Sequence, residues 1–144
     1  MRYETIEHDL RTCEVRCLSI RQPYADLMLV DKIETRTTTT RYRGLVLICS
    51  AKEAHSDFAD DINFTATQYI LGHTIAIGTL CDVIQKEAFT DSQWKKTYVD
   101  NKYMGSVYGW VFKDIHRINP FPYKGQLGLV RATKEIIGQI NIIW

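Results

Sequence analysis

The stretch that decides the fold is Cys17-Leu18-Ser19-Ile20-Arg21-Gln22-Pro23-Tyr24-Ala25. Apolar residues alternate with polar ones around residues 15–20, which predicts a short strand. Pro23 then fits the first turn of a helix, because the N–H that proline lacks has no partner at a helix start. The apolar residues that follow carry this helix to about Lys32 and predict that it is well buried. A strand that leads directly into a buried helix therefore begins the fold.

Strands outnumber helices in the rest of the chain. The apolar run at 45–50 is typical of a central strand, and further extended segments are predicted at 34–43, 74–83, 107–118, 125–131 and 139–144. Helical pieces are predicted at 52–61, 63–71, 92–99 (capped by Asp91) and 133–137. Because the strands do not alternate regularly with helices, we predict an α+β fold. Its mixed, mostly antiparallel sheet curls toward a small β-barrel with flanking helices.

Length and composition indicate one domain of ordinary character. We assign residues 1–14 to an N-terminal arm, loose or extending a sheet edge, and residues 15–144 to a single domain. The net charge of +1 argues against a generic binder of polyanions, although it allows a local basic patch. No apolar stretch approaches the roughly 20 residues of a membrane span, and the first residues do not resemble a signal peptide. We expect a cytoplasmic protein without membrane association.

The cysteines and histidines do not predict a metal site. The four cysteines form no CxxC pair, and the histidines are scattered, so neither a metal nor a metal partner is expected. Cys49 and Cys81 lie in apolar runs and are predicted to act as small core side chains. Phosphate-loop and common hydrolase motifs are also missing, so no cofactor is predicted.

A first polar cluster lies where the strand ends and the helix begins. It consists of Ser19, Arg21, Gln22 and Tyr24. Arg21 and Gln22 can donate to a phosphate or a base edge, and Tyr24 offers a face on which a nucleobase can stack. The alternative is structural: Ser19 or Gln22 caps the helix, Arg21 is solvated and Tyr24 packs. Taken alone, this segment favours the structural alternative.

A second cluster contains Glu34, Arg36, Arg41 and Arg43. Glu34 and Arg36 share a face in an extended segment and can form a charge-assisted pair. That pair is either a strut between helix and sheet or a device that orients Arg36 toward a ligand. Arg41 and Arg43 either flank a groove or form a solvated strand edge. A third cluster joins Trp110 to Lys124 and its neighbouring glycines. Trp110 is more typical of a core, and Lys124 is a candidate phosphate or base contact.

In order along the chain, these clusters resemble the ASCH domain family of the PUA-like superfamily. The resemblance covers roughly residues 15–131 and rests on Leu18-Ser19-Ile20-Arg21-Gln22-Pro23-Tyr24-Ala25, Glu34-x-Arg36-Thr37, Tyr42-Arg43-Gly44, Gly78-Thr79-Leu80-x-Asp82-Val83, Tyr108-Gly109-Trp110-Val111 and Pro122-Tyr123-Lys124-Gly125-Gln126-Leu127-Gly128-Leu129. It implies a PUA-like barrel with a cleft across its face. It also implies binding of RNA or other nucleic acid and, in some members, hydrolysis of acylated cytidines or of RNA.

The chain departs from the usual family stretch Gly-x-Lys-x-x-Glu-x-Arg. Glu34 and Arg36 match, but an ungapped alignment puts Leu29 at the Gly position and Asp31 at the Lys position, with Lys32 one residue too close to Glu34. The amidohydrolases of the family also use a threonine at the position of Glu34. An aspartate cannot supply the positive charge that stabilises an oxyanion. The resemblance therefore favours binding over catalysis in this chain.

Two functions follow as predictions. The first is a non-catalytic module that binds RNA or a modified nucleotide in a cleft lined by Ser19, Arg21, Gln22, Tyr24, Glu34, Arg36, Arg43, Trp110 and Lys124. The second is a small hydrolase acting on an acylated nucleoside or on RNA, with Glu34 as the base and Lys32 or Lys124 as the cation. An adaptor that binds a protein partner through the barrel edge remains a third alternative.

Overall fold

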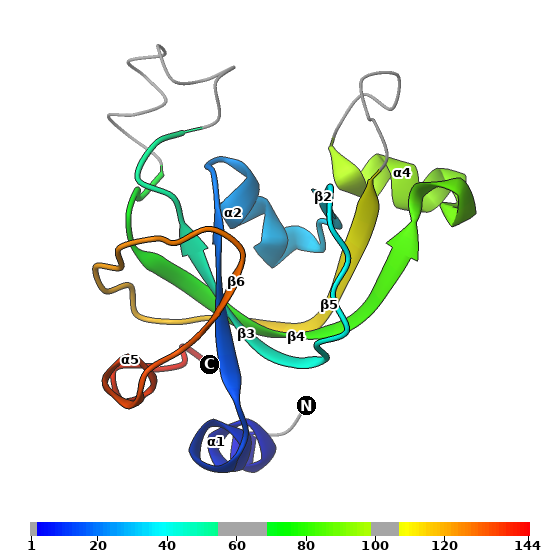
Figure 1. Cartoon of the computed structure of the whole chain (residues 1–144). Helices are drawn as coiled ribbons and strands as arrows, with labels where there is room; N and C mark the ends of the chain where they lie inside the picture. The colour runs from blue at the N-terminus through cyan, green and yellow to red at the C-terminus, as the bar shows by residue number, and fades with distance from the viewer. Residues whose placement is uncertain (1–2, 55–68, 99–106) are drawn as a thin grey trace.

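Six strands form one mixed sheet in the computed structural model, which describes residues 3–54, 69–98 and 107–144. The sheet order is β2-β5-β4-β3-β1-β6, and the strands are β1 (Val15–Ile20), β2 (Glu34–Arg36), β3 (Gly44–Ser50), β4 (Thr74–Gln85), β5 (Tyr108–Arg117) and β6 (Leu129–Arg131). Strands β1 and β3 are parallel, and all other pairs are antiparallel. The sheet curls into a half-barrel (Figure 1). The predicted α+β class and the mixed, mostly antiparallel sheet are confirmed.

The central strand β3 is apolar from Leu45 to Cys49 because both of its faces are buried. Val46 and Ile48 point into one cluster of core side chains, whereas Leu47 and Cys49 point into another. Successive side chains of a strand point to opposite faces of the sheet, so a strand covered on both sides has no polar positions to alternate with. The sheet therefore has a core on each face, and each core needs a covering layer.

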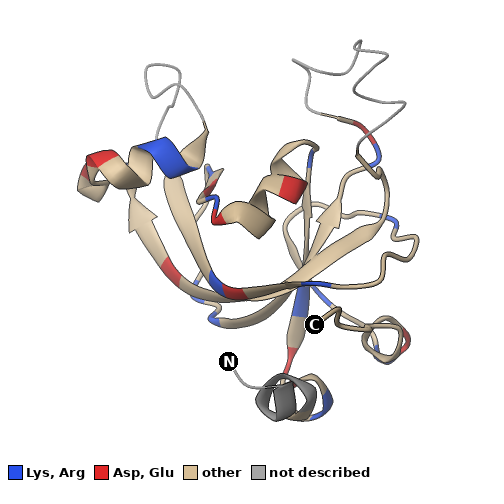
Figure 2. Ribbon diagram, turned by 180° about the vertical axis from the view of Figure 1, so that it is seen from behind, with Lys and Arg blue, Asp and Glu red and all other residues tan. Residues whose placement is uncertain are grey.

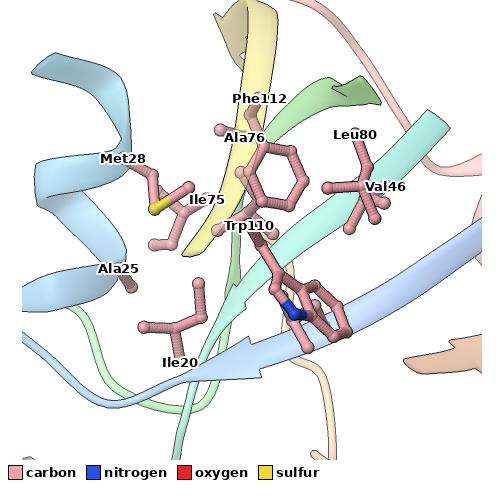
Figure 3. Close-up of a cluster of buried hydrophobic side chains, with 11 residues drawn as sticks. Ile20, Ala25, Met28, Val46, Ile75, Ala76, Leu80, Trp110 and Phe112 are labelled. Carbon is pink, nitrogen blue, oxygen red and sulfur yellow. The ribbon is translucent and has the colours of Figure 1, made fainter. Parts of the chain in front are cut away.

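Helix α2 (Tyr24–Leu27) and the 3-10 turn η1 (Met28–Val30) cover the concave face. Ala25 and Met28 are fully buried and lie beside Ile20 and Ile75 (Figure 3). Four residues are too few for a helix that is stable by itself, so its packing in the half-barrel must hold it in place. The helix begins at Tyr24, directly after Pro23, and the helical segment ends near the predicted position.

The convex face is covered by α1 (Tyr3–Thr12) and α5 (Lys134–Gly138). Leu10 of α1 belongs to the second core cluster, and Ile136 and Ile137 of α5 pack against it. The sequence predicted a loose arm or an edge extension before residue 13; the chain forms a helix there instead. Its core contact explains the difference, because a single well-buried leucine is hard to recognise in a segment that is otherwise polar.

Several predicted elements differ from the observed ones. The predicted strand at 139–144 is wrong, because that segment makes only an isolated bridge between Ile142 and Ile118. The strand predicted at 125–131 is confined to β6. Helix α4 (Asp91–Thr97) is confirmed, but Thr90 rather than Asp91 caps it, through a hydrogen bond from the Gln93 N–H. The helices predicted at 52–61 and 63–71 fall largely outside the described residues.

The two cysteines predicted for the core have different positions. Cys49 is fully buried, as predicted. Cys81 is exposed, so the prediction for it is wrong. In β4 the pairing with β5 shifts between Leu80 and Asp82, which leaves Cys81 as the extra residue of a bulge. A local bulge of this kind breaks the alternation on which the prediction depended.

Gly109 of β5 has no room for a side chain, which gives a stability prediction. A Cβ atom at Gly109 would lie 2.5 Å from the Phe89 ring and 2.9 Å from Ile33. We expect Gly109→Ala to lower the free energy of unfolding by about 1–3 kcal/mol, the usual effect of overpacking. Gly138→Ala is the control, because nothing lies within 4 Å of its Cβ position, and it should be close to neutral. Equal stability of the two variants in denaturant titrations would contradict the packing described for β5.

Candidate nucleotide-binding cleft

A cleft of about 1510 Å³ is lined by the short helix, by β2 on one side and by the end of β1 on the other. Residues predicted from the sequence as site residues make up much of its wall: Ser19, Arg21, Tyr24, Glu34, Arg36 and Lys124. Residues 122–128, which lead into β6, complete the β1 side. Strand β6 pairs with β1, so this loop is held near the β1 terminus. The cleft thus joins segments that are far apart in the sequence.

Three charged residues form linked ion pairs on the β2 side of the cleft. The ammonium of Lys32 lies 3.1 Å from Glu34 Oε1, and the guanidinium of Arg36 lies 3.1 Å from Glu34 Oε2. The side chains of Lys32 and Glu34 are only 1% and 9% exposed. Lys32 also donates to the Ile33 carbonyl, and its ammonium lies 5.4 Å from the centre of the Tyr24 ring. The Glu34 carboxylate thus faces two cations, and its pair with Lys32 lies where water has little access.

Strand geometry explains why Glu34 and Arg36 meet. Residues two apart in a strand point to the same face, and the predicted pair between these two side chains is confirmed. The strand is held by antiparallel pairing with β5, in which Glu34 is opposite Trp110. Arg36 also stacks over Trp110, with its guanidinium 5.6 Å from the ring centre. The orientation of Arg36 is thus set by a carboxylate and an aromatic ring together.

Asp31 does not occupy the cleft, although an ungapped alignment puts it at the family's lysine position. Asp31 has a left-handed backbone conformation with φ of 70°. Its side chain is 70% exposed and pairs with Lys96 of α4. The turn brings the next residue, Lys32, into the cleft wall beside Glu34. A cation is therefore present next to Glu34, one position later than the alignment indicates.

Three of the predicted binding residues do not line the cleft: Gln22, Arg43 and Trp110. Gln22 is fully buried, and its amide bonds to Asp26 and to the Ile70 carbonyl, so it fastens the helix start. Arg43 donates to the carbonyls of Thr40 and Tyr42. Trp110 is a core residue whose indole N–H donates to the Thr38 carbonyl. Gln22 thus holds the start of the helix and Trp110 packs in the core, as in the structural alternatives considered for these two residues.

Other cleft residues were not predicted as site residues. Lys52 follows β3, and Tyr98 ends α4 in a left-handed conformation. Leu127 is 99% exposed on the loop that leads into β6. One signal in the sequence points to Lys52: it is a basic residue just after a central strand. That signal identifies a cleft residue only once the parallel pairing of β1 and β3 is known. Tyr98 and Leu127 had no distinctive local pattern.

Tyr123 connects the cleft to the core on the other face of the sheet. It lines the cleft and packs against the second core cluster. Burial is the main cause that raises the pKa of the Tyr123 phenol, and its hydrogen bond with Cys17 raises the pKa further. The phenol is therefore neutral at physiological pH. It anchors the start of the loop and does not contribute a charge to the cleft.

The charge of the cleft differs from that of the whole chain. Lys, Arg, Asp and Glu are intermingled along the sheet, helices and loops (Figure 2). Among the residues that the structure describes, five basic residues line the cleft, whereas Glu34 is its one carboxylate. A chain with a net charge of only +1 thus concentrates positive charge where it encloses space. An anionic ligand is the kind that such a cleft attracts.

The described ranges contain neither a cluster of metal ligands nor a helix that could span a membrane. Within residues 3–54, 69–98 and 107–144, no three His, Cys, Asp or Glu side chains gather as metal ligands. Over those same ranges, no helix has the length and apolar character needed to cross a membrane.

Comparison with known proteins does not assign the chain to a family. The chain matches no protein-family model, and a search of the curated proteins finds no matching sequence.

Proposed function

We propose that this chain is a nucleic-acid-binding module of the ASCH type, with a PUA-like barrel, that binds single-stranded RNA or a modified nucleotide in the cleft. The observation that carries the proposal is the gathering of six of the nine residues predicted from the sequence around one concave surface. These residues come from β1, the connection that follows it, α2, β2 and the loop before β6. A cytoplasmic location is part of the same proposal.

The side chains of the cleft supply the two kinds of contact that single strands need. Proteins bind single strands through cationic groups that follow the backbone and aromatic faces on which bases stack. Arg21, Arg36 and Lys124 are the candidate cations, and Tyr24 is the candidate stacking face. Trp110 is left out of this role because it is buried in the core. Glu34 adds an acceptor that can meet the amino group of a base.

A titration with single-stranded RNA at increasing salt tests the proposal. Affinity for single strands is expected to fall with salt, with a log–log slope of roughly −0.7 per neutralised phosphate. Arg21, Arg36 and Lys124, each neutralising one phosphate, therefore predict a slope of about −2. Arg43→Ala is the matched control for Arg21→Ala, because both arginines are exposed but only Arg21 lines the cleft. We expect Arg21→Ala alone to weaken binding. No binding to any single strand at low salt would refute the proposal.

A second candidate function is a small hydrolase acting on an acylated nucleoside or on RNA. It is favoured by one observation: Lys32, rather than Asp31, lies beside Glu34 in the cleft wall. In this mechanism Glu34 accepts a proton, and Lys32 or Lys124 stabilises developing negative charge. Turnover of acylated nucleosides or RNA that is lost in Glu34→Gln would support it. A panel of both substrate types that yields no product would remove it.

A further inference from the structure

We propose that the β1 side of the cleft is a phosphate subsite formed by Arg21, Lys52, Lys124 and the hydroxyl of Ser19. The inference rests on the proposed function and makes its ligand specific. The ligand is a nucleotide whose phosphate lies on the β1 side, with its base toward Tyr24 and Glu34. The two sides of the cleft thus recognise different parts of one molecule.

Backbone hydrogen bonds bring the three basic residues together. The Ala51 N–H donates to the Ile20 carbonyl at 2.9 Å, the Gly72 N–H to the Ala51 carbonyl at 3.1 Å, and the Tyr123 N–H to the Gly72 carbonyl at 2.9 Å. This chain of bonds joins four separate segments, at Ile20, Ala51, Gly72 and Tyr123. Arg21 directly follows Ile20, Lys52 follows Ala51, and Lys124 follows Tyr123. Each basic residue therefore directly follows a residue that takes part in these backbone hydrogen bonds.

The parallel pairing of β1 with β3 explains the first part of this arrangement. Ile20 pairs with Ser50, so both strands end at the same edge of the sheet. Arg21 and Lys52 follow these two ends and emerge next to each other. An antiparallel pair would have put them at opposite edges. The topology of the sheet therefore creates a basic edge that no local sequence motif contains.

The basic residues of the β1 side are uncompensated, unlike those of the β2 side. Lys32 and Arg36 both pair with Glu34. Over the residues that the structure describes, no carboxylate pairs with Arg21, Lys52 or Lys124. Neighbouring like charges repel each other, and a bound anion relieves that repulsion. A phosphate is therefore expected on the β1 side and not beside Glu34.

The hydroxyl of Ser19 is a second observation, beside the uncompensated cations, that favours a phosphate on the β1 side. Ser19 lines the cleft, and its buried hydroxyl has no hydrogen-bond partner within the described part of the chain. A Cβ atom at Gly125 would lie 2.7 Å from this oxygen, so glycine lets the loop backbone pass close to it. Buried hydroxyl groups normally have a partner. A phosphate oxygen held by the three cations would supply an acceptor for Ser19.

The test compares nucleosides with their monophosphates. The four ribonucleosides and their 5′-monophosphates are titrated into the protein, and binding is followed by the shifts of amide resonances. We expect the monophosphates to bind at least about tenfold more tightly, because hydrogen bonds to charged groups are the strong ones. Lys52→Ala should remove most of this difference and leave nucleoside binding unchanged. Lys95→Ala, which changes an exposed lysine of α4 outside the cleft, should have no effect.

The outcomes separate the subsite from the proposed function. Equal affinity for nucleosides and monophosphates would overturn the subsite and leave the binding module intact. A phosphate preference that is undiminished in Lys52→Ala would overturn it as well, since Lys52 would then contribute nothing to phosphate binding. Failure of nucleosides, monophosphates and single-stranded RNA to bind would refute both. Competition by inorganic phosphate against the monophosphates alone would support the subsite directly.

Discussion

Replacing Glu34 with alanine is expected to lower the free energy of unfolding by about 3–5 kcal/mol, the usual cost of leaving a buried charge without its partner. Glu34 holds the ammonium of Lys32, whose side chain is 1% exposed, and the guanidinium of Arg36. Without the carboxylate, the Lys32 ammonium keeps its hydrogen bond to the Ile33 carbonyl but loses its ion pair. Chemical denaturation of the purified variant measures the loss.

The exposed ion pair between Lys96 and Asp31 supplies the control. Its side chains are 47% and 70% exposed, and such pairs contribute about 0–1 kcal/mol. Lys96→Ala should therefore be nearly neutral. The double variant Lys32→Met with Glu34→Gln should recover most of the stability lost in Glu34→Ala, because it removes both buried charges. A loss below about 1 kcal/mol for Glu34→Ala, comparable with a surface pair, would contradict a buried network.

Tyr24→Ala is expected to weaken binding of single-stranded RNA by roughly 5- to 140-fold, the range that loss of one base–aromatic stack produces. Tyr24 is the aromatic residue of the helix that faces the cleft, whereas Trp110 is confined to the core. The Lys32 ammonium lies near the Tyr24 ring, so a positive charge is present beside the proposed stacking face. Fluorescence anisotropy with a labelled single strand measures the change.

Tyr24→Phe is the matched control, because it preserves the ring and removes only the hydroxyl. We expect the phenylalanine variant to bind within a few-fold of the parent chain. Tyr24 also packs against the core cluster, so the melting of each variant must be recorded beside its affinity. Equal affinities for the parent, alanine and phenylalanine chains would exclude a stacking role for this residue.

Much of the fold could be predicted because periodicity is a local signal. The continuous apolar run of β3 and the alternation of β5 identified buried strands before any contact was known. The helix at the N-terminus and the bulge at Cys81 were not predictable in this way, since both depend on contacts with distant segments. The parallel pairing of β1 with β3 also depends on a connection that passes through the helix and β2.

The candidate site shows the same division between local and distant information. Glu34 and Arg36 were correctly paired from their spacing alone. The position of Lys32 depended on the left-handed turn at Asp31, a conformation that sequence spacing does not reveal. Predicting that Lys52 lines the cleft required knowledge of the sheet topology. Gln22 looked like a ligand donor, but its buried amide is fully occupied in fastening the helix.

A map of amide chemical shifts during titration with single-stranded RNA tests the central claim most directly. The account predicts that the largest changes occur at the amides of residues lining the cleft, including Ser19, Thr35 and Gly125. Small changes are expected at α1 and α5, which cover the opposite face of the sheet. Changes concentrated at α1 and α5, or no changes at any RNA concentration, would contradict it.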